Sequence, residues 1–517
     1  MEGKMKRLLM SFVTVVLLAS FAFAQSSKTT DVVVVGGGFG GLAAAVSALE
    51  GGAKVILIEK TPALGGASNF VEGSLAVESP LNKKLGKGKT KEEVFRTIME
   101  FHHWNVNAAM TRKMINQSGD TIQWLMDMGV NFKGIVTVYP PEKSNYTWHI
   151  YDRAGAAGVK ALTAKVRALG GEILTETPGM KLIVKNGAVV GVEATDDEGE
   201  KLTINAKAVV LATGGYSVNK ELLNKYIPGY DEMGMIIMGP IPDKRTGDGV
   251  LRAEAVGAQL VSMNVLEASG PFLPVEPAVE QQIGGPDRIR HVKAALLQPF
   301  LWVNGDGNRF IDESLGSDWA ITHNAMMQNG GKMFCIMDET QRKMLVEKGS
   351  ILANSDFVPA GTKLTGLPEG FELGMKNGYV FKANTIADLA KQIGVDPKNL
   401  QASINNVNAY AKSGVDPEFQ RRKDLLYTFQ SKGPYYAIRG IPSYFSTLGG
   451  VKINDNAQAL DTHGKVIPGL YAVGHDMGGM FDSTYYLIKE GSASYFALNS
   501  GRIAGDHITR TVTKTKK

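Results

Sequence analysis

The sequence is poor in cysteine, in long apolar segments and in excess charge. Cys335 is the only cysteine among 517 residues, so an internal disulfide, a C-x-x-C-H haem site and a set of iron–sulfur ligands are all excluded. The net charge of +5 is too small to indicate nucleic-acid binding. Beyond the first 24 residues, no segment is apolar and long enough to span a bilayer. With no haem or cluster of its own, a redox protein of this sequence would need a separate electron carrier.

The first 24 residues are typical of a secretion signal. Three basic residues within the first seven positions precede an apolar run over 8–21, and a small-x-small triplet at 22–24 offers a cleavage site before Gln25. We therefore expect a bacterial protein exported by a Sec-type signal to the periplasm or another extracytoplasmic space, without a membrane anchor after cleavage. The alternative is that the segment stays uncleaved and anchors the chain.

The segment over 32–41 carries the strongest functional signal. Four valines predict a buried parallel strand, and Gly36, Gly38 and Gly41 complete the pattern G-x-G-x-x-G before a helix expected over 42–49. These glycines permit a tight turn, close approach of the backbone to a pyrophosphate, and close packing of helix on strand. The N-terminus of the helix favours the phosphate charge. The pattern therefore indicates dinucleotide binding, and the alternative is a purely structural glycine-rich turn.

A second strand supports the dinucleotide interpretation. It is expected over 54–58 and ends in Glu59, which lies 18 residues after Gly41. A carboxylate at about this distance hydrogen-bonds a ribose hydroxyl in dinucleotide-binding folds. Strand, turn, helix, strand and acid thus occur in the required order.

The rest of the chain alternates between helical and extended patterns. Apolar residues recur at helical spacing over 91–128, as at Ile122, Leu125 and Met126. The segment over 81–92 is rich in lysine and glycine, and we expect an exposed loop there. Further expected elements are helices over 158–169, 385–393, 399–413 and 491–508, a β-meander over 171–212 that ends in a buried strand over 208–212, and a strand over 469–474.

The nucleotide-binding pattern is interrupted and then resumed. Prolines cluster after residue 266, strands mix with short helices, and a strand ending in glycine returns near residue 470. We expect an α/β fold in which a nucleotide-binding domain over 25–265 and 446–517 is interrupted by an α+β capping domain over 266–445.

Four more glycine motifs, at 64–68, 212–215, 245–249 and 469–474, extend the pattern. Together with the first, they resemble the flavoprotein subunits of the fumarate reductase and succinate dehydrogenase family. The resemblance covers 31–265 and 440–508 well and the middle loosely. The members most similar in kind are soluble, exported flavin reductases of the flavocytochrome c fumarate reductase and urocanate reductase type, here without the haem domain. The resemblance implies a Rossmann-like FAD-binding domain, formed by a parallel sheet and the β-meander.

The resemblance also implies FAD and assigns residues to it. Because no histidine occurs between Lys60 and Phe101, where membrane-bound relatives attach FAD, we expect a non-covalent cofactor. The implied contacts are Gly36, Gly38, Phe39, Gly40 and Gly41 for the pyrophosphate; Glu59 and Lys60 for the adenosine end; Gly65, Gly66, Ala67 and Ser68 for the diphosphate and isoalloxazine; Met180 or a neighbour for adenine; Ala212, Thr213 and Gly214 for the phosphate side; Gly474, His475 and Asp476 for the ribityl chain; and Ser492 and Ala493 for the pyrimidine edge. Asp248 is a further implied contact with FAD.

The sequence departs from the family where fumarate enzymes carry cationic substrate ligands. In these enzymes the arginine that delivers the proton lies eight residues after an Arg-Phe pair. The pair is Arg309-Phe310 here, and the eighth residue after Arg309 is Ser317. Phe445 occupies the position of a family histidine, and Tyr485 lies near the position of the last family arginine. A dicarboxylate would lose several charge-assisted hydrogen bonds, each worth about 1.5–3 kcal/mol. We therefore do not expect a fumarate reductase. Arg309 itself is expected to pair with a nearby acid, Asp312 or Glu313.

The expected pocket is aromatic, with Tyr444, Phe445, Phe481, Tyr485 and Tyr486 along the capping-domain side. A tyrosine hydroxyl can protonate a carbanion or enolate when its neighbours tune it. The catalytic candidates are Tyr485, with Tyr486 and His149 as alternates. The competing interpretation for each tyrosine is core or wall packing with a satisfied hydroxyl, and for His149 it is a polar loop residue. Glu72 and Glu267 stay unassigned.

The function expected from these features is an exported FAD-dependent oxidoreductase acting on CH–CH bonds. It would reduce an activated C=C bond of an enoate or enone, aromatic or mono-anionic rather than fumarate, in anaerobic respiration. Its partners would be the small substrate and an external donor such as a periplasmic cytochrome or quinol-linked protein, without metal or nucleic acid. Alternatives are a dehydrogenase or oxidase of the ketosteroid or amino-acid type, and a non-catalytic FAD electron-transfer protein.

Overall fold

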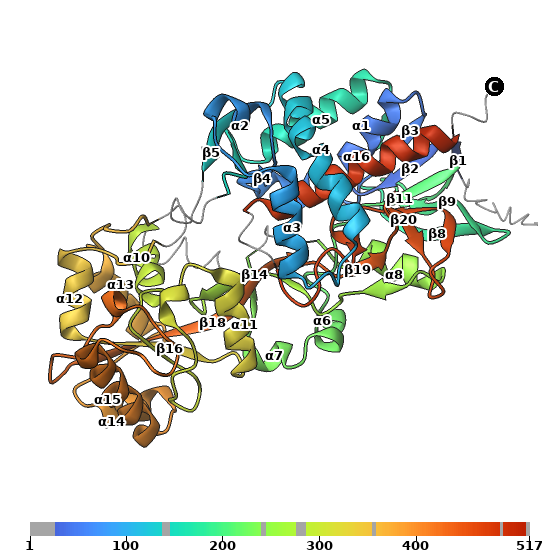
Figure 1. The fold of residues 1–517 in the computed structure, drawn as a ribbon. Helices are drawn as coiled ribbons and strands as arrows, with labels where there is room; N and C mark the ends of the chain where they lie inside the picture. The colour runs from blue at the N-terminus through green and yellow to red at the C-terminus, as the bar shows by residue number, and fades with distance from the viewer. Residues whose placement is uncertain are drawn as a thin grey trace, which may run out of the picture.

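The computed structural model describes residues 26–136, 145–238, 244–275, 286–353, 358–485 and 490–512. The expected signal segment and Tyr486 lie outside these ranges. Within them, no helix is both long and apolar enough to cross a bilayer. Two lobes are visible, with the N- and C-terminal parts of the chain together in one and the middle of the chain in the other (Figure 1).

A six-stranded sheet forms the centre of the first lobe. Its order is β20-β21-β11-β2-β3-β7, and all neighbours are parallel except β20, which runs antiparallel to β21. Consecutive apolar residues suit these strands because helices and other sheets bury both faces. The strands are β2 (Val32–Val35), β3 (Val55–Ile58), β7 (Glu172–Leu174), β11 (Ala208–Leu211), β20 (Gln458–Leu460) and β21 (Val466–Ala472).

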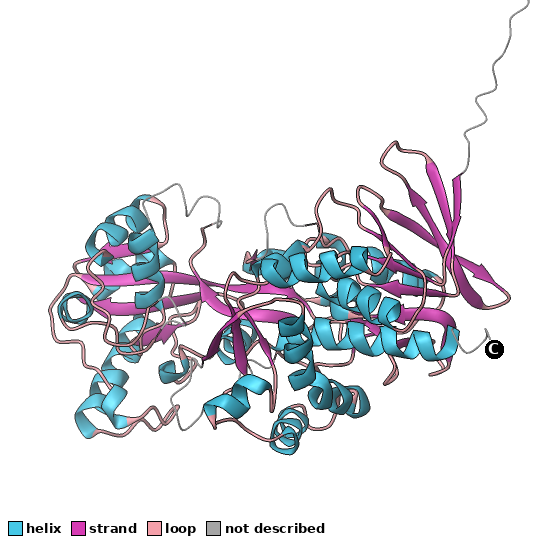
Figure 2. Cartoon of the chain, turned by 90° about the horizontal axis from the view of Figure 1, so that it is seen from above, coloured by secondary structure: helices cyan, strands magenta, loops and turns pink. Residues whose placement is uncertain are grey.

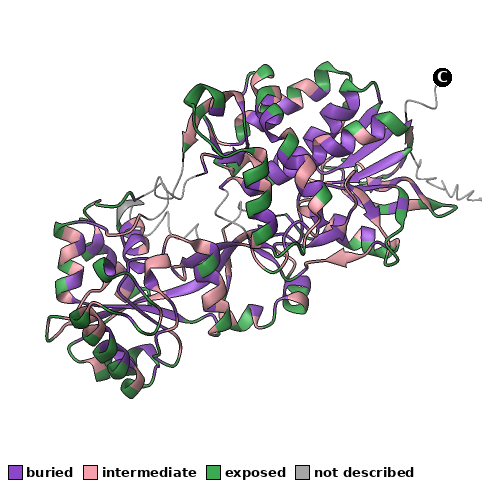
Figure 3. Ribbon diagram, in the orientation of Figure 1, coloured by how far each residue is buried: buried purple, intermediate pink, exposed green. Residues whose placement is uncertain are grey.

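Helices from the two ends of the chain pack side by side on this sheet. These are α1 (Phe39–Glu50), shown in blue, and α16 (Ser492–Val512), shown in red (Figure 1). A Cβ at Gly501 of α16 would lie 2.2 Å from the carbonyl oxygen of Gly40, so the backbones touch where glycine occurs. Buried residues follow the sheet and this helix pair (Figure 3). The C-terminal segment therefore completes the nucleotide-binding domain.

The β-meander expected over 171–212 is partly wrong. Only β8 (Gly179–Lys185), β9 (Ala188–Thr195) and β10 (Lys201–Asn205) form antiparallel pairs, and β1 (Ser26–Thr29) adds a parallel edge strand. The first and last strands of the segment, β7 and β11, belong to the parallel sheet instead. The reason is that β7 follows the crossover helix α5 (Ala156–Ala168), which returns the chain parallel to β3.

The helical region near residue 100 also differs from expectation. The expected loop over 81–92 contains α2 (Pro80–Leu85), and the helical periodicity over 91–128 corresponds to two helices, α3 (Lys91–Phe101) and α4 (Ala108–Asp127). His103 and Trp104 adopt left-handed backbone angles, φ 49° and 60°, which end the first helix. The side chain of Asn107 then caps α4 by accepting a hydrogen bond from the N–H of Met110.

The second lobe is built around one long strand, β18 (Tyr435–Thr447). It pairs with β12, β14, β16 and β17, and it runs from this lobe toward the first one (Figure 2). The lobe has its own apolar cores, separate from that of the sheet domain. Its strands are β12 (Ile236–Ile237), β14 (Leu266–Phe272), β15 (Leu301–Val303), β16 (Met333–Asp338) and β17 (Val380–Ala383), and its helices are α10 (Pro286–Leu296), α11 (Trp319–Gln328), α12 (Glu339–Glu347), α13 (Leu367–Lys376), α14 (Ile386–Ile393) and α15 (Pro397–Ser413).

The remaining elements are small. They are the sheet of β4 (Gly73–Leu75), β6 (Trp148–Tyr151) and β5 (Phe132–Val136), the sheet of β13 (Leu260–Val261), β19 (Gly450–Lys452) and β22 (Met477–Gly478), and the helices α6 (Lys220–Tyr226), α7 (Tyr230–Met233) and α8 (Asp248–Ala255). The expected α/β fold, a Rossmann-like domain with an inserted α+β domain, is confirmed. The domain boundaries at 265 and 445 stay predictions.

Candidate functional site

The turn after β2 is a backbone cradle that requires glycine. Gly36 has φ 110°, and a Cβ there would lie 2.2 Å from the carbonyl oxygen of Ala212. A Cβ at Gly41 would lie 1.9 Å from the carbonyl oxygen of Gly36. Gly38 is the N-cap of α1 and places no side chain over the start of the helix. The helix N-terminus is thus open to an anion, which fits a pyrophosphate.

A second glycine loop lies directly on this turn. The Gly65 N–H donates to the carbonyl oxygen of Gly37 at 2.9 Å, and the Phe39 N–H donates to Ser68 Oγ at 3.0 Å. A Cβ at Gly66 would meet no atom within 4 Å. The structure therefore brings together the two segments that the sequence assigned to the cofactor, and leaves open space beside Gly66.

Acidic and basic groups lie at the other end of the cradle. Glu59 accepts hydrogen bonds from the N–H of Gly37 and of Thr61, both at 2.9 Å. Lys60 Nζ lies 2.6 Å from the carboxylate of Asp248, the first residue of α8. Burial acts to raise the pKa of Asp248, but the hydrogen bond and charge of Lys60 outweigh it and lower that pKa. These residues lie where the adenosine end of FAD is expected. Met180, expected near adenine, belongs to β8, and its side chain lies outside the described part of the structure.

Asp476 has a different position from the one expected. Its fully buried carboxylate accepts hydrogen bonds from Thr213, through N–H and Oγ1, and from the Gly215 N–H. Burial raises its pKa. The side chain therefore holds the turn after β11 against the turn after β21. This corrects the expectation that it lies along the ribityl chain, because its oxygens are already occupied.

Tyr485 lies at the N-terminus of α16. Ser492 Oγ donates to its phenol oxygen at 2.9 Å, and the Ala493 N–H is a second donor to it. Since both contacts are donated to the oxygen, neither uses the tyrosine's own proton. The side chain is 4% exposed, and burial, followed by the charge of Glu267, raises its pKa far above the usual range. Tyr485 therefore stays protonated at every physiological pH.

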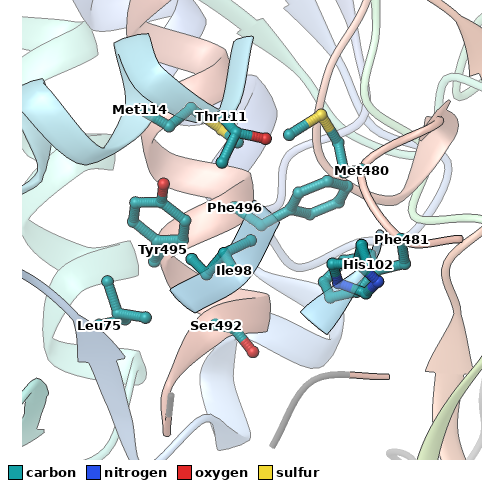
Figure 4. A pocket seen from close by; sticks show the side chains of 10 residues that line it. All are labelled: Leu75, Ile98, His102, Thr111, Met114, Met480, Phe481, Ser492, Tyr495 and Phe496. Carbon is teal, nitrogen blue, oxygen red and sulfur yellow. The ribbon is translucent and has the colours of Figure 1, made fainter. Parts of the chain in front are cut away.

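An aromatic cluster and a small cavity lie behind this tyrosine. The ring of Phe481 is 5.6 Å from that of Tyr485 and 5.8 Å from that of Phe496. The cavity, of about 30 Å³, has room for one or two water molecules (Figure 4). Two hydroxyls in its wall, Thr111 Oγ1 and Tyr495 OH, make no hydrogen bond to any described residue. The cavity is lined by Leu75, Ile98, His102, Thr111, Met114, Met480, Phe481, Ser492, Tyr495 and Phe496.

His149 does not have the surroundings of a catalytic base. It lies on β6, fully buried, with Nε2 2.6 Å from Ser79 Oγ and Nδ1 2.8 Å from the carbonyl oxygen of Thr147. Burial lowers its pKa to about 4, so the ring is neutral. Because both ring nitrogens are occupied, His149 is a packing residue. The alternative of a polar loop residue is also wrong, since the residue belongs to a strand.

Tyr444 and Phe445 are neighbours in β18 but differ in their surroundings. Tyr444 is fully buried, and its hydroxyl donates to the carbonyl oxygen of Ser217 at 2.8 Å and contacts Tyr230 OH at 2.8 Å. Tyr444 is thus a core residue and does not line a pocket, which corrects the expectation. Phe445 is partly exposed and lies over Trp319, with ring centroids 6.2 Å apart.

The residues at the positions of the family's cations carry no charge. The Oγ of Ser317 donates to the carbonyl oxygen of Ala353 at 2.6 Å, which leaves this side chain a local structural role. A different cation, Arg245, was not singled out from the sequence. It is 9% exposed, and its Nη2 donates to the carbonyl oxygen of Phe445 at 2.9 Å. One guanidinium therefore lies beside the strand that carries Phe445.

Arg309 pairs with acids, as expected. Its guanidinium lies 2.7 Å from Glu313 and 2.7 Å from Asp416, and Arg421 contacts Glu313 at 3.1 Å. The side chains of Arg309, Glu313 and Asp416 are at most 2% exposed. Asp416 was not foreseen, because it lies 107 residues farther along the chain. Arg309 is therefore part of the core of the second lobe.

Glu267 is one of the two acids that the sequence left without a role. Its carboxylate lies 3.6 Å from His475 Nε2, and its charge acts on Tyr485. The strand pattern alone could not reveal this contact, because β14 and the turn that carries His475 are distant in sequence.

Comparison with known proteins agrees with this geometry. A family model described as an FAD binding domain matches residues 31–488. The vinyl phenol reductase of Lactiplantibacillus plantarum is 33% identical over 488 residues, which cover 92% of this chain and 96% of that protein. The open conformation of a flavocytochrome c3 fumarate reductase is 28% identical with a TM-score of 0.66, covering 94% of this chain and 79% of that one.

A third similarity concerns the fold alone. The structure of a 3-ketosteroid Δ1-dehydrogenase from Sterolibacterium denitrificans has a TM-score of 0.71 at 20% identity, covering 94% of this chain and 100% of that one. The glycine cradle, the open helix N-terminus and the family match all agree on the cofactor. The chain therefore belongs to the FAD-binding family of fumarate reductase-like flavoproteins and is an FAD-dependent oxidoreductase.

Proposed function

We propose that this protein is an exported reductase of an activated C=C bond in an aromatic or mono-anionic molecule. The observation that carries the proposal is the aromatic packing beside Tyr485, whose ring lies 5.6 Å from that of Phe481, which in turn lies 5.8 Å from that of Phe496. Ser317 and Phe445 occupy the other two positions where a dicarboxylate would need cations. The resemblance to a vinyl phenol reductase supports a substrate with an aromatic ring.

Tyr485 is the proposed proton donor. FAD, when bound, supplies the redox chemistry, the transfer of a hydride to one carbon of the double bond. Tyr485 would then protonate the other carbon, because its O–H proton is not committed to Ser492 or Ala493. The two groups that donate to its oxygen would also stabilise the tyrosinate that forms. Tyr486 stays an alternate, outside the described residues.

The proposed substrate carries at most one carboxylate. Arg245 is a buried guanidinium beside Phe445, and one such group can pair with one carboxylate. A neutral phenol-bearing olefin would not need this contact. Fumarate, with two carboxylates, would leave one of them without a cationic partner at the positions of Ser317, Phe445 and Tyr485.

Export, localisation and electron supply are parts of the same proposal. The signal-like segment over 1–24 supports a periplasmic or other extracytoplasmic protein. The single cysteine supports an external donor, such as a periplasmic cytochrome or quinol-linked protein, in anaerobic respiration. We also propose that FAD is bound non-covalently.

The test is anaerobic oxidation of reduced viologen by the FAD-loaded protein. The substrates would be a vinyl phenol, a cinnamate, urocanate, an acrylate, a simple enone and fumarate. Turnover with the aromatic olefins but not with fumarate is expected. Rapid fumarate reduction would contradict the assigned pocket, and steady H₂O₂ formation from a saturated substrate in air would favour the dehydrogenase alternative.

A further inference from the structure

A cluster of lysines lies on α2 and on the turn that follows it, where the helix packs against β5 at the periphery of the first lobe (Figure 1). The segment over 79–91 has lysine at positions 83, 84, 87, 89 and 91 and contains no acidic residue. Lys83, Lys84 and Lys87 are exposed, and none of them forms an ion pair with a residue that the structure describes. These three side chains form the basic patch, and no part of the proposed reduction uses them.

Local hydrogen bonds hold the basic patch in place. The side chain of Ser79 caps α2 by accepting a hydrogen bond from the N–H of Asn82 at 3.1 Å, and Gly86 ends the helix with φ 65°. Asn82 Nδ2 donates to the carbonyl oxygen of Tyr146 at 2.8 Å, which fixes the helix against the chain that leads into β6. The Nζ of Lys87 lies 5.5 Å from the centroid of the Tyr146 ring. The three cations are therefore displayed on a surface of defined shape.

The strand β6 connects the basic patch with the cradle expected to hold FAD. The hydroxyl that caps α2 lies 2.6 Å from Nε2 of His149 on this strand. Two residues farther along, the ring of Tyr151 lies 6.0 Å from that of Phe39, the first residue of α1. A Cβ at Gly155 would lie 1.9 Å from the carbonyl oxygen of Ser68, so the chain after β6 also touches the second glycine loop. The patch is thus joined to both loops of the cradle through one small sheet.

We propose that the basic patch is a docking surface for the acidic face of an external electron-carrier protein. The inference rests on the proposed function, because it requires that electrons come from a separate protein. Opposite charges on two proteins attract each other before contact and select the orientation in which they meet. A carrier held at this patch lies beside the small sheet that borders the cradle. Reduction of one C=C bond takes two electrons and two protons, so two one-electron carriers are oxidised for each product formed and the solvent supplies the protons.

The charges around the patch favour a protein over a membrane as the partner. Glu78 precedes α2, Glu92 and Glu93 lie in the first turn of α3, and all three acids are exposed. A flat anionic bilayer would bring its charge over these acids as well as over the lysines, and repulsion would then offset part of the attraction. The acidic face of a small protein can cover the basic patch alone. A protein with such a face therefore fits this surface better than a bilayer does.

The first test is a binding measurement that needs no turnover. Flavodoxin, a small acidic electron carrier, would be titrated calorimetrically into the FAD-free and the FAD-loaded protein at low ionic strength. The patch variant combines Lys83→Glu, Lys84→Glu and Lys87→Glu. The control variant makes the same charge change on exposed lysines of α14 and α15 in the second lobe, with Lys391→Glu, Lys398→Glu and Lys412→Glu.

The expected binding follows from the charges. The patch variant should bind flavodoxin at least about tenfold more weakly than wild type, and the control variant should stay within about twofold. The affinity of wild type should fall as salt is added, because exposed charges are then screened. A basic cytochrome c should not bind at the patch.

A second measurement shows whether docked flavodoxin delivers electrons. Reduced flavodoxin or reduced methyl viologen would drive the reduction of a vinyl phenol by the FAD-loaded protein under anaerobic conditions. The flavodoxin-driven rate should fall at least about tenfold in the patch variant, whereas the viologen-driven rate should stay within about twofold, since a small dye needs no docking surface. Glutamine at the same three positions should give an intermediate loss, and an unchanged thermal midpoint shows that the variants are folded.

The outcomes separate this inference from the proposed function. Equal flavodoxin affinity in the patch and control variants would overturn the inference, as would a wild type that does not bind flavodoxin at low ionic strength. Binding of phosphatidylglycerol vesicles that is lost in the patch variant, without binding of flavodoxin, would overturn it in favour of a membrane surface. A wild type that reduces no olefin with viologen would refute the proposed function, and the binding measurement would still decide the docking surface.

Discussion

Replacing Arg309 with methionine tests whether a buried cation of the second lobe supports the fold or the chemistry. The guanidinium lies 2.7 Å from both Glu313 and Asp416, and the three side chains are at most 2% exposed. Removing one partner of a buried ion pair leaves uncompensated charge and destabilises a protein by about 3–5 kcal/mol. Arg421 still faces Glu313 at 3.1 Å, so the loss falls mainly on Asp416. We therefore expect Arg309→Met to lose about 3–5 kcal/mol of stability.

The assay is urea unfolding of the FAD-loaded protein, followed by tryptophan fluorescence. Arg342→Met is the matched control, because Arg342 also forms a two-point ion pair, with Glu339, but at side chains 16% and 20% exposed. Its expected loss is about 0–1 kcal/mol. If Arg309→Met is as stable as wild type but has lost turnover, the structural role of Arg309 is refuted and a role in substrate binding is favoured.

Three further predictions address the cofactor cradle, acid stability and the proton donor. Gly36→Ala should abolish the retention of FAD, because the added Cβ would lie 2.2 Å from the carbonyl oxygen of Ala212. Gly187→Ala, whose Cβ would have no atom within 4 Å, should retain FAD. FAD retention is measured by flavin absorbance after desalting, and retention by both variants would contradict the proposed cofactor cradle. Burial acts to raise the pKa of Asp416, but hydrogen bonds from Arg309 and from backbone amides hold that pKa at about 2. The stability that the ionised Asp416 contributes is therefore full above about pH 4 and is lost as the pH falls toward 2. If the thermal midpoint of Arg309→Met falls with acid in the same way as that of wild type, this prediction is contradicted. Tyr485→Phe should lower the first-turnover rate of olefin reduction about 10²–10⁴-fold, as general acids contribute, while FAD binding is unchanged; an unchanged rate would remove Tyr485 as donor.

The sequence could predict the cofactor cradle because its determinants are local. A valine run, a glycine pattern and an acid at the right distance specify strand, turn and strand, and the structure has β2, α1 and β3 there. The return of the fold near the C-terminus was also predictable. The strand β21, which ends just before Gly474, completes the parallel sheet, and the helix α16 covers α1.

Other features depend on contacts that no sequence pattern contains. The helical periodicity over 91–128 does not reveal the left-handed turn at His103 and Trp104, which divides this segment into two helices. Strand patterns do not show pairing, so β7 and β11 were assigned to the meander although they pair in parallel.

Polar side chains were the hardest to place for the same reason. Asp476 follows a glycine expected at the cofactor, yet its carboxylate is saturated by the turn after β11. His149 has the chemistry of a base, but Nδ1 donates to the carbonyl oxygen of Thr147, Nε2 accepts from the Ser79 hydroxyl, and burial keeps the ring neutral. The ion pair of Arg309 with Glu313 was foreseen since the two residues are four apart, whereas Asp416 and the pair of Glu267 with His475 come from distant segments.

The most direct test of the account is a single turnover of the reduced, FAD-loaded protein under anaerobic conditions. The flavin absorbance would be followed after mixing with a vinyl phenol and, separately, with fumarate. The account predicts rapid reoxidation by the vinyl phenol with formation of the saturated phenol, and no reoxidation by fumarate on the same timescale. Reoxidation by fumarate at a comparable or higher rate would contradict the proposed aromatic site around Tyr485.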